Sequence, residues 1–410
     1  MKVGLVFKMA WRSLWRNKRR TLITAASVTF ALVLALVTDS MTKGSHESMI
    51  GNTLKFGTGY LQIQDTAYFE SPSLDLGFKL PQEIADKLGQ NFTKDSYLIP
   101  RIQSFILAAG EDITKSALVI GIDPELEHRM NGFFNFMKEG RIFESGKSEL
   151  IIGSGLAKRL SLNLGDTLVL IGQGYQGMQA AGKYPISGII EHPMDQLNNQ
   201  LIYMDLPDAQ WLFAMENQFS HYLIMCASEK EALRIQKSLA DSFEGSGLRL
   251  LNWKELQPEL VKALAFDLVS GRIMQGILYL VISFGIFGTV LTMTMERQKE
   301  FAIMVSLGMK RRLLAAQCFI ETLLISSLGV VGGLILGLPV LLYFYSHPIP
   351  LSKDLSDLAK DYGMEPFLHF SLSTEVFLFQ GILLLLISLV ITAYPVWRSM
   401  TFPLLQNLRR

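Results

Sequence analysis

Four long apolar stretches divide the chain, at residues 21–38, 273–295, 313–345 and 376–396. Each is long enough to cross the hydrocarbon core of a membrane, so the pattern predicts four transmembrane helices. A basic prefix before an apolar run is also typical of a secretory signal peptide. We favour an uncleaved span, because the first run has eighteen residues and follows a long amphipathic segment. The third stretch is overlong, so its outer end must tilt, kink at Pro339 or project beyond the membrane.

The segment before the first span, residues 1–20, predicts an amphipathic helix. It holds seven basic residues and no acidic one. Its apolar positions recur at helical spacing and leave the cations on another face. These positions are Val3, Phe7, Trp11, Leu14 and Trp15. A helix at the membrane interface, with tryptophan at headgroup depth, explains this pattern.

The region between the first two spans, residues 39–272, contains no run long enough to cross a membrane. Short segments typical of strands alternate there with helical ones. We predict strands at residues 60–64, 105–109, 117–122, 167–171, 186–190, 201–204 and 222–226, and helices that include 81–88 and 229–243. This mixture makes a large α+β domain with its own core and room for two lobes. Residues 253–271 predict a helix that leads into the second span.

The basic residues near the spans predict the orientation of the chain. Fifteen Lys and Arg residues lie in three short segments, at residues 1–20, 296–312 and 397–410. The loop at residues 346–375 has only Lys353 and Lys360, against five acidic residues. Both termini and the 296–312 segment are therefore predicted to be cytoplasmic, with the 39–272 domain and the loop outside. Within the loop, residues 351–362 predict a short amphipathic helix.

The composition narrows the classes of function. Hydrophobic residues make up 49% of the 410 residues and charged residues only 18%, which favours a membrane protein with a large soluble part. A net charge of +1 gives no case for nucleic-acid binding. Two cysteines and six histidines are scattered without metal-ligand spacing, so we predict no metal site. The sequence has no G-x-x-x-x-G-K-[ST] motif, so we predict no ATP site or other cofactor in this chain.

Two glycine-containing motifs resemble parts of enzyme sites. Residues 172–177 match G-x-G-x-x-G after a predicted strand, but no helix follows, so we favour a glycine-rich hairpin over a dinucleotide site. The sequence Gly153-Ser154-Gly155 does not meet G-x-S-x-G, and no His or Asp partner is persuasively placed. We therefore predict no catalytic residue.

The segment at residues 296–312 is short, charged and caught between the second and third spans. Phe301, Met304, Val305 and Gly308 share one face at helical spacing, flanked by five basic residues. Periodicity and charge leave two interpretations balanced. One is a plain loop held in the cytoplasm by its cations, and the other is a surface helix that docks into another protein and passes motion to the spans.

The third span carries two further features. Glu321 is the only charged residue within the four runs, and a buried carboxylate is costly unless it is paired or protonated. A proton relay would need further acids in the spans, so we favour a structural pairing role. Gly329, Gly333 and Gly337 recur every four residues and allow close helix packing. That face suits either this chain's own spans or, as we prefer, a second membrane chain of the same kind.

The order of these features resembles a known family. Residues 296–308, followed by an apolar run with Glu321 and the cluster at 329–333, look like the FtsX-like permease domain of the MacB/LolC/LolE superfamily of ABC transporter permeases. The segment at residues 10–22 is similar to the start of that family. Residues 150–157, with Leu164-Gly-Asp-Thr167, resemble its MacB-type extracytoplasmic domain. The resemblance covers nearly the whole chain.

The resemblance implies a membrane domain of four helices arranged 1 + 3, with a large α+β domain of the MacB periplasmic-core type after the first. It also implies a pair of permease chains, identical or mixed, bound to two cytoplasmic ATPase subunits that hold ATP and Mg²⁺. Their motion would be carried into extracytoplasmic work. The residues matching the ATPase-coupling segment are Glu296, Arg297, Glu300, Phe301, Met304, Gly308 and Arg311.

By this resemblance, the chain is a non-catalytic subunit in a bacterial inner membrane. Because a MacB chain carries a fused ATPase domain, we expect more similarity to LolC or LolE. We therefore favour release of lipoproteins toward the outer membrane, with a lipoprotein substrate and a periplasmic chaperone as partners. MacB-like efflux of peptides or drugs is the close alternative. An FtsX-like regulator of an extracytoplasmic enzyme comes next, and a membrane-anchored enzyme last.

Overall fold

The computed structural model describes residues 3–16, 18–144, 146–352, 354–356 and 366–401. These residues form two compact units, one helical and one of mixed α and β structure. The helical unit lies within Met1–Glu47, Leu264–Ile349 and Leu368–Arg410, and the mixed unit within Ser48–Ala263 and Pro350–Phe367. A large α+β region thus follows the first long helix, as predicted.

Four helices are long and apolar enough to cross a membrane, which confirms the number predicted. They are α2 (Lys18–Thr53), α10 (Pro258–Glu296), α12 (Arg311–Ser346) and α14 (Thr374–Thr401). Both α2 and α10 extend beyond the apolar runs from which they were predicted, and a π-helical turn, Leu54–Thr58, continues α2. The short α9 (Trp253–Leu256) precedes α10, so the predicted helix there breaks at Gln257 before Pro258.

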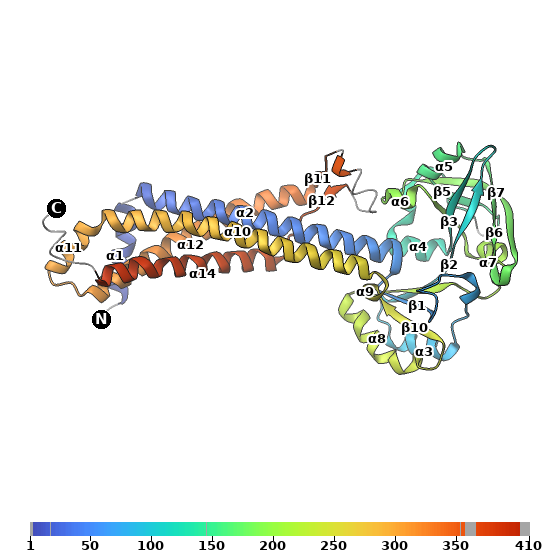
Figure 1. Cartoon of the computed structure of the whole chain (residues 1–410), viewed down its shortest axis with the longest axis horizontal. Helices are drawn as coiled ribbons and strands as arrows, with labels where there is room; N and C mark the ends of the chain where they lie inside the picture. The colour runs from blue at the N-terminus through green and yellow to red at the C-terminus, as the bar shows by residue number, and fades with distance from the viewer. Residues whose placement is uncertain (1–2, 17, 145, 353, 357–365, 402–410) are drawn as a thin grey trace. The chain divides into compact units, whose positions relative to one another are not determined.

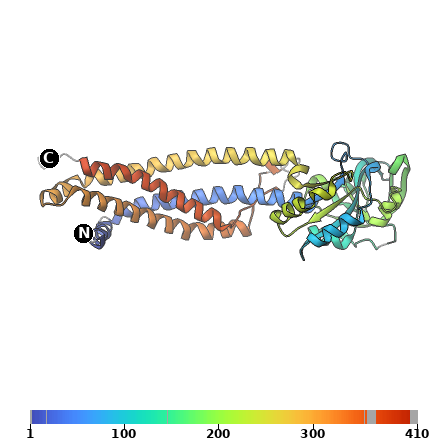
Figure 2. The same cartoon turned by 90° about the horizontal axis from the view of Figure 1, so that it is seen from below.

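The core of the helical unit is formed by residues of α2, α10, α12 and α14, the four long helices of Figures 1 and 2. Gly329, Gly333 and Gly337 face α2: a Cβ added at Gly329 would lie 2.6 Å from Val28 Cβ, and one at Gly333 2.8 Å from Leu32 Cβ. No side chain fits that approach. This chain's own first span therefore occupies the glycine face, and our preference for a second permease chain there is wrong.

Helix α10 leaves much of its apolar surface uncovered in the described chain. Its large apolar side chains that are more than half exposed include Phe266, Ile273, Ile277, Leu280 and Phe284. Tyr279 donates to Gln380, and Gln380 donates to Asp39 Oδ2 at 3.0 Å. Asp267 and Glu296 of α10 also pair with His46 and Arg20 of α2. One span is thus loosely covered, whereas α12 is closely packed.

The loop between the last two spans contains two short paired strands, β11 (Ile349–Pro350) and β12 (Phe367–Leu368). Residues 354–356 are helical, but most of the amphipathic helix predicted at 351–362 lies outside the described residues. The same holds for 402–410 of the predicted tail.

The larger lobe of the mixed unit is built on a closed six-stranded barrel. Its strands are paired in the order β2 (Tyr97–Ala109), β3 (Thr114–Ile122), β8 (Leu201–Asp205), β5 (Leu150–Gly153), β7 (Gln179–Ile190), β6 (Thr167–Gln173) and back to β2. Alternate residues point inward and form a buried core that includes Ile102, Val119, Ile152, Leu170, Ile186 and Ile202. The glycine-rich segment forms the turn of the β6–β7 hairpin, as predicted.

Shorter elements cover this barrel. They are η2 (Leu74–Leu76), α4 (Pro124–Asn131), η3 (Phe133–Phe136), β4 (Met137–Gly140), α5 (Ser154–Leu160), η4 (Tyr175–Gly177), α6 (Asp195–Asn198) and α7 (Leu206–Leu212). Strand β4 pairs with β7. A second core, which contains Ile120, Phe133 and Tyr203, fills the space outside the barrel wall under η3.

The smaller lobe is an antiparallel sheet with two helices on one face. Its strands follow the order β10 (Leu248–Asn252), β1 (Leu61–Asp65), β9 (His221–Met225) and the first half of β2. Helices α3 (Gln82–Asn91) and α8 (Glu229–Phe243) cover it through a shared apolar core. All seven predicted strands are present, and the lobes share β2; β4, β5 and β10 were missed.

Candidate functional site

The segment between α10 and α12 is a short helix, α11 (Gln298–Ser306), closed by a glycine turn. Gly308 has φ +95°, and its N–H donates to Val305 O, while the N–H of Met309 donates to Met304 O. These two bonds form a Schellman motif, which needs a residue with positive φ. Gly308 therefore lies in the turn that ends α11, and its predicted place on the helix face is wrong.

The predicted apolar face of α11 is turned toward this chain's own α12. Phe301 is only 3% exposed and packs against Leu314 and Cys318. Met304 and Val305 lie at the edge of the same cluster. The structure thus uses this face to fix α11 on α12, and it is not free to meet another protein.

The opposite face of α11 is exposed. Ile303 is 52% exposed and Leu307 is 83% exposed, with Lys299 and Lys310 exposed nearby in the sequence. Exposed apolar residues beside cations are the part of this segment that remains accessible to a partner. The sequence pattern did not single these residues out.

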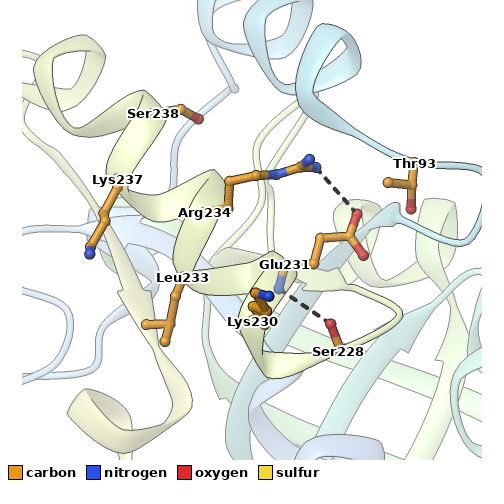
Figure 3. Close-up of a pocket in the computed structure, with 8 residues that line it drawn as sticks. All are labelled: Thr93, Ser228, Lys230, Glu231, Leu233, Arg234, Lys237 and Ser238. Carbon is orange, nitrogen blue, oxygen red and sulfur yellow. Dashed lines mark hydrogen bonds and ion pairs between the residues drawn. The ribbon is translucent and has the colours of Figure 1, made fainter.

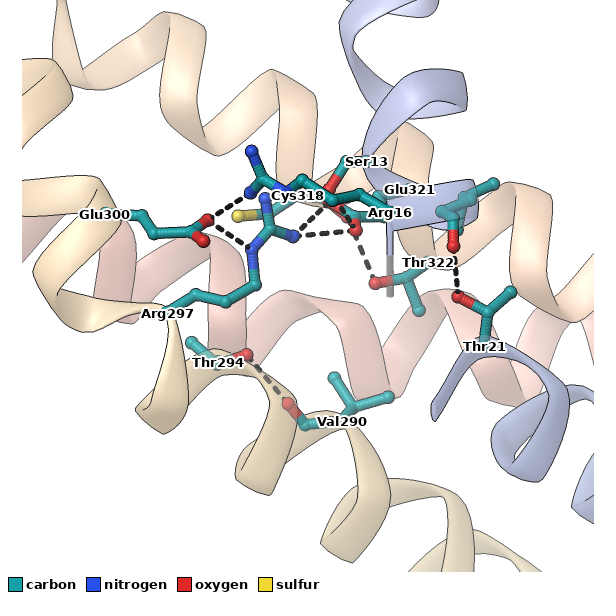
Figure 4. A network of polar contacts seen from close by, with 11 residues as sticks. Ser13, Arg16, Thr21, Val290, Thr294, Arg297, Glu300, Cys318, Glu321 and Thr322 are labelled. Atoms are coloured by element: carbon teal, nitrogen blue, oxygen red, sulfur yellow. Dashed lines mark hydrogen bonds and ion pairs between the residues drawn. The ribbon is translucent and has the colours of Figure 1, made fainter. Parts of the chain in front are cut away.

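A buried ion pair joins the start of α11 to the middle of α12. Arg297 Nη1 donates to Glu321 Oε1 at 2.7 Å and to Oε2 at 2.6 Å, and both side chains are at most 5% exposed. Ser13 Oγ on α1 (Val3–Arg16) donates to Glu321 Oε1 at 2.9 Å (Figure 4). The Arg297 guanidinium also lies 5.2 Å from the ring centre of Phe301. Glu321 thus has the ion-pair partner that a carboxylate buried in a span requires.

More exposed ion pairs surround this buried one. Arg16 donates to Glu300 Oε2 at 2.5 Å, and Arg297 Nε lies 3.4 Å from the same oxygen. Arg20 on α2 pairs with Glu296, the last residue of α10. We call these residues the charge network: Ser13, Arg16, Arg20, Glu296, Arg297, Glu300 and Glu321. The charge network connects α1, α2, α10, α11 and α12. Figure 4 shows the part of it formed by Ser13, Arg16, Arg297, Glu300 and Glu321.

The charge network contains several predicted site residues and excludes others. Glu296, Arg297, Glu300 and Glu321 belong to it, and Phe301 packs beside it. Arg311 instead donates to Met400 O at 2.9 Å and fastens the start of α12 to α14. The three glycines lie further along α12, against α2. Ser13, Arg16 and Arg20 were missed, because their partners are hundreds of residues away in sequence.

The mixed unit offers an open hollow of about 870 Å³ along α8 (Figure 3). Several of its polar side chains already serve the fold: Ser228 caps α8, and Arg234 lies 3.8 Å from Glu231, which accepts a hydrogen bond from Ser96. These groups do not converge on a common point as a binding site requires. The charge network, which links five helices, is therefore the stronger candidate.

Comparison with known proteins places the chain in a family. A family model described as FtsX-like permease C-terminal matches residues 272–404, and one described as MacB-like periplasmic core domain matches residues 21–241, more than half of the chain. The chain belongs to the FtsX/MacB family of ABC transporter permeases. Membership implies an ATPase partner and a dimeric arrangement. It also agrees with the fold class predicted from sequence.

The chain is also similar to several individual proteins. The lipoprotein-releasing system transmembrane protein LolC of Xylella fastidiosa is 23% identical over 313 residues, which cover 73% of this chain and 74% of LolC. LolC of Haemophilus influenzae is 23% identical over 289 residues, 68% of this chain and 69% of that one. An uncharacterised ABC transporter permease of Mycobacterium tuberculosis is 28% identical over 249 residues, 58% of this chain but 27% of that protein.

Two solved structures resemble part of the chain. The extracellular domain of the transporter YknZ from Gram-positive bacteria matches with a TM-score of 0.32 and 14% identity, covering 47% of this chain and 99% of that one. The periplasmic region of MacB from Actinobacillus actinomycetemcomitans matches with a TM-score of 0.33 and 11% identity, covering 49% and 91%.

Proposed function

We propose that this permease is the membrane subunit of a lipoprotein-releasing ABC transporter in a bacterial inner membrane. ATP hydrolysis by a cytoplasmic partner would be converted into work by the extracytoplasmic mixed unit. The similarity to LolC, which extends over about three quarters of both chains, supports this substrate class. The uneven distribution of cations supports an orientation with both termini and α11 in the cytoplasm.

The observation that carries the coupling part of the proposal is the position of α11. Its outer face presents Ile303 and Leu307, while its inner face is fixed to α12 by Phe301. Arg297, immediately before α11, is held by Glu321 of α12. A push on the exposed face would therefore reach α12 through a packed aromatic ring and a buried ion pair. We assign the ATPase-docking role to Ile303 and Leu307.

The other predicted coupling residues then act within the chain. Arg297 and Glu300 hold α11 against α1 and α12, and Glu296 holds the end of α10 against α2. Phe301 and Met304 transmit force through packing, and Arg311 fastens α12 to α14. For the second permease chain we propose the uncovered face of α10, because the glycine face of α12 is occupied.

Docking is tested by adding charge to the exposed face of α11. Ile303→Asp with Leu307→Asp should abolish copurification of the ATPase and the ATP hydrolysis of the complex, because the contact surface loses its apolar character. Leu233→Asp is the matched control, since Leu233 is a 40% exposed leucine on α8 in the mixed unit. Full ATPase retention by the double variant would contradict the docking assignment.

The substrate class needs a separate experiment. Proteoliposomes that contain the purified complex, ATP and an acceptor chaperone should release acylated protein, and ADP should not support release. Movement of non-acylated peptides alone would favour efflux. ATP hydrolysis without release of either, combined with altered activity of a bound extracytoplasmic enzyme, would favour a regulator.

A further inference from the structure

Helix α1 has three distinct faces, and only one of them is explained by the fold. The first face packs against α12 through Val6, Ala10 and Leu14, none more than 5% exposed. Ser13 lies on the same face and reaches Glu321. This face fixes α1 against α12, and the other two faces of α1 point away from α12.

The second face is an aromatic stripe. Phe7, Trp11 and Trp15 recur every four residues and are 48%, 41% and 64% exposed. The two indole rings meet edge to face, with centroids 6.2 Å apart. Three large aromatic residues exposed in one line are costly in water but favourable at a membrane–water interface. The chain then enters α2, whose Leu22 and Ile23 are also more than half exposed, so the apolar surface continues into the span.

The third face is cationic and lacks acidic partners. Lys8 and Arg12 each follow an aromatic residue by one position, about 100° round the helix, and both are exposed. Neither forms an ion pair within the residues that the structure describes, and the same is true of Arg19 on α2. Arg16, by contrast, has Glu300 as its partner. The positive charge beside the stripe is thus uncompensated within the described chain.

We propose that α1 is a binding surface for anionic phospholipids of the leaflet it faces, with Trp11 and Trp15 at headgroup depth and Lys8 and Arg12 on the lipid phosphates. The aromatic stripe continues into a membrane span, so the surface faces lipid. The cations beside the stripe complement the negative charge of lipid phosphates, which favours anionic phospholipids as the ligand. Each Lys or Arg near an anionic membrane surface increases the binding constant for that surface by roughly fivefold. The inference is independent of the transported substrate.

Lipid bound here would bear directly on the charge network. Ser13 and Arg16 lie on the same short helix as Lys8 and Arg12, and they hold Glu321 and Glu300. Anionic lipid would therefore steady α1 and, through these two contacts, the position of α11.

Quenching of tryptophan fluorescence by brominated lipids tests the proposal on the full chain in nanodiscs. One set carries brominated phosphatidylglycerol and the other the same fraction of brominated phosphatidylcholine. The signal of α1 is the difference between the unmodified chain and the Trp11→Phe/Trp15→Phe variant, which removes the contribution of the other tryptophans. We expect several-fold stronger quenching of this signal by the anionic lipid.

Neutralising the cations separates headgroup binding from simple insertion. Lys8→Gln with Arg12→Gln should lower the preference for the anionic lipid over phosphatidylcholine by roughly tenfold or more. Quenching by phosphatidylcholine should persist. Lys115→Gln with Lys183→Gln, which removes two exposed cations from the mixed unit, should leave the preference unchanged. Equal quenching by both lipids in the unmodified chain, or a preference that survives Lys8→Gln/Arg12→Gln, would overturn the proposal. So would quenching by neither lipid, since another molecule would then cover α1.

Discussion

Among the described residues, each compact unit contains one buried arginine–glutamate pair, and the surroundings of the two pairs differ. In the mixed unit, Arg101 of β2 donates to both oxygens of Glu127 on α4 at 2.5–2.6 Å, and both side chains are at most 1% exposed. Asn131 also donates to Glu127, and Tyr203 lies 3.5 Å from it. Within the part of the chain that the structure describes, the other side chains that contact this pair are uncharged, so it is closed on itself.

In the helical unit, the buried pair opens onto further charges. Arg297 contacts Glu321 at 2.6 Å and Glu300 at 3.4 Å, and Glu300 in turn contacts Arg16, which is largely exposed. Arg297 therefore has two carboxylates within reach. In the described part of the mixed unit, the Arg101–Glu127 pair has no second carboxylate to which the arginine could move. Arg297, which lies between two carboxylates, can strengthen its contact with one while it weakens its contact with the other. This difference leads us to expect that the first pair serves stability and the second serves coupling.

The closed pair should give the largest loss of stability. Glu127→Gln leaves the Arg101 guanidinium buried without a counter-charge, which typically costs about 3–5 kcal/mol. We expect that loss in the free energy of unfolding of the mixed unit, measured by pulse proteolysis in urea on the full chain. Glu125→Gln, an exposed change on the same helix, should have little effect. A loss below about 1 kcal/mol for Glu127→Gln would remove the contrast between the two pairs.

The open pair should separate stability from function. Glu321→Gln should destabilise the helical unit by less, about 1–3 kcal/mol, because Glu300 remains near Arg297. The double change Arg297→Met/Glu321→Leu should recover most of that stability, since buried pairs are often replaceable by apolar residues. It should still uncouple ATP hydrolysis from transport, whereas Arg101→Met/Glu127→Leu should leave transport intact. Equal transport by both double variants would refute the coupling role.

Local patterns in the sequence predicted much of the fold. The four spans follow from apolar length, and the seven predicted strands from alternation, because both depend on neighbouring residues. Strands β4 and β5 have only four residues each, too few for a clear period, whereas β10 was missed although it is as long as the predicted β1, β8 and β9. The closure of the barrel was not predictable, because it depends on β6 pairing with β2 across some sixty residues.

The candidate site was predicted only in part, because its local patterns are visible in the sequence and its contacts between distant residues are not. Helical periodicity placed Phe301 and Met304 on one face but could not say that α12 covers it. The glycines of α12 predicted a close helix neighbour, but not that α2 is the neighbour. The cost of a buried carboxylate predicted that Glu321 has a partner, yet Ser13 is 308 residues away. Sequence patterns thus identify the surfaces and charges that need partners, and the tertiary fold supplies them.

Acidification should lower the free energy of unfolding of the mixed unit by a moderate amount. Burial, with Arg101 nearby, lowers the pKa of His221 to about 3, and burial lowers the pKa of His192 to about 4. Both are neutral when folded, whereas the unfolded chain binds their protons below pH ~6.5. The mixed unit should therefore keep its stability above that pH and lose about 1.4 kcal/mol per pH unit for each histidine below it, until each folded pKa is reached.

Unfolding of the full chain at pH 7.5 and 5.5 measures this loss. His221→Gln should reduce the difference between the two pH values, because the variant has no proton to gain on unfolding at that position. A chain whose mixed unit is equally stable at both values, or a His221→Gln variant with the same pH dependence, would show that the histidine does not remain neutral beside Arg101.

The exposed edge of the charge network should give the smallest effect on stability. Arg16 and Glu300 side chains are 61% and 43% exposed, so water already screens their attraction. Arg16→Gln should change the thermal stability of the detergent-solubilised chain no more than Arg19→Gln, which removes an exposed arginine that has no acidic partner among the described residues. Transport should fall more for Arg16→Gln than for Arg19→Gln, because Arg16 contacts Glu300 and Arg19 forms no ion pair within the described residues. If Arg16→Gln lost as much stability as Glu321→Gln, burial would not determine how much each ion pair of the network contributes to stability. The distinction between a stabilising pair and a coupling pair would then fail.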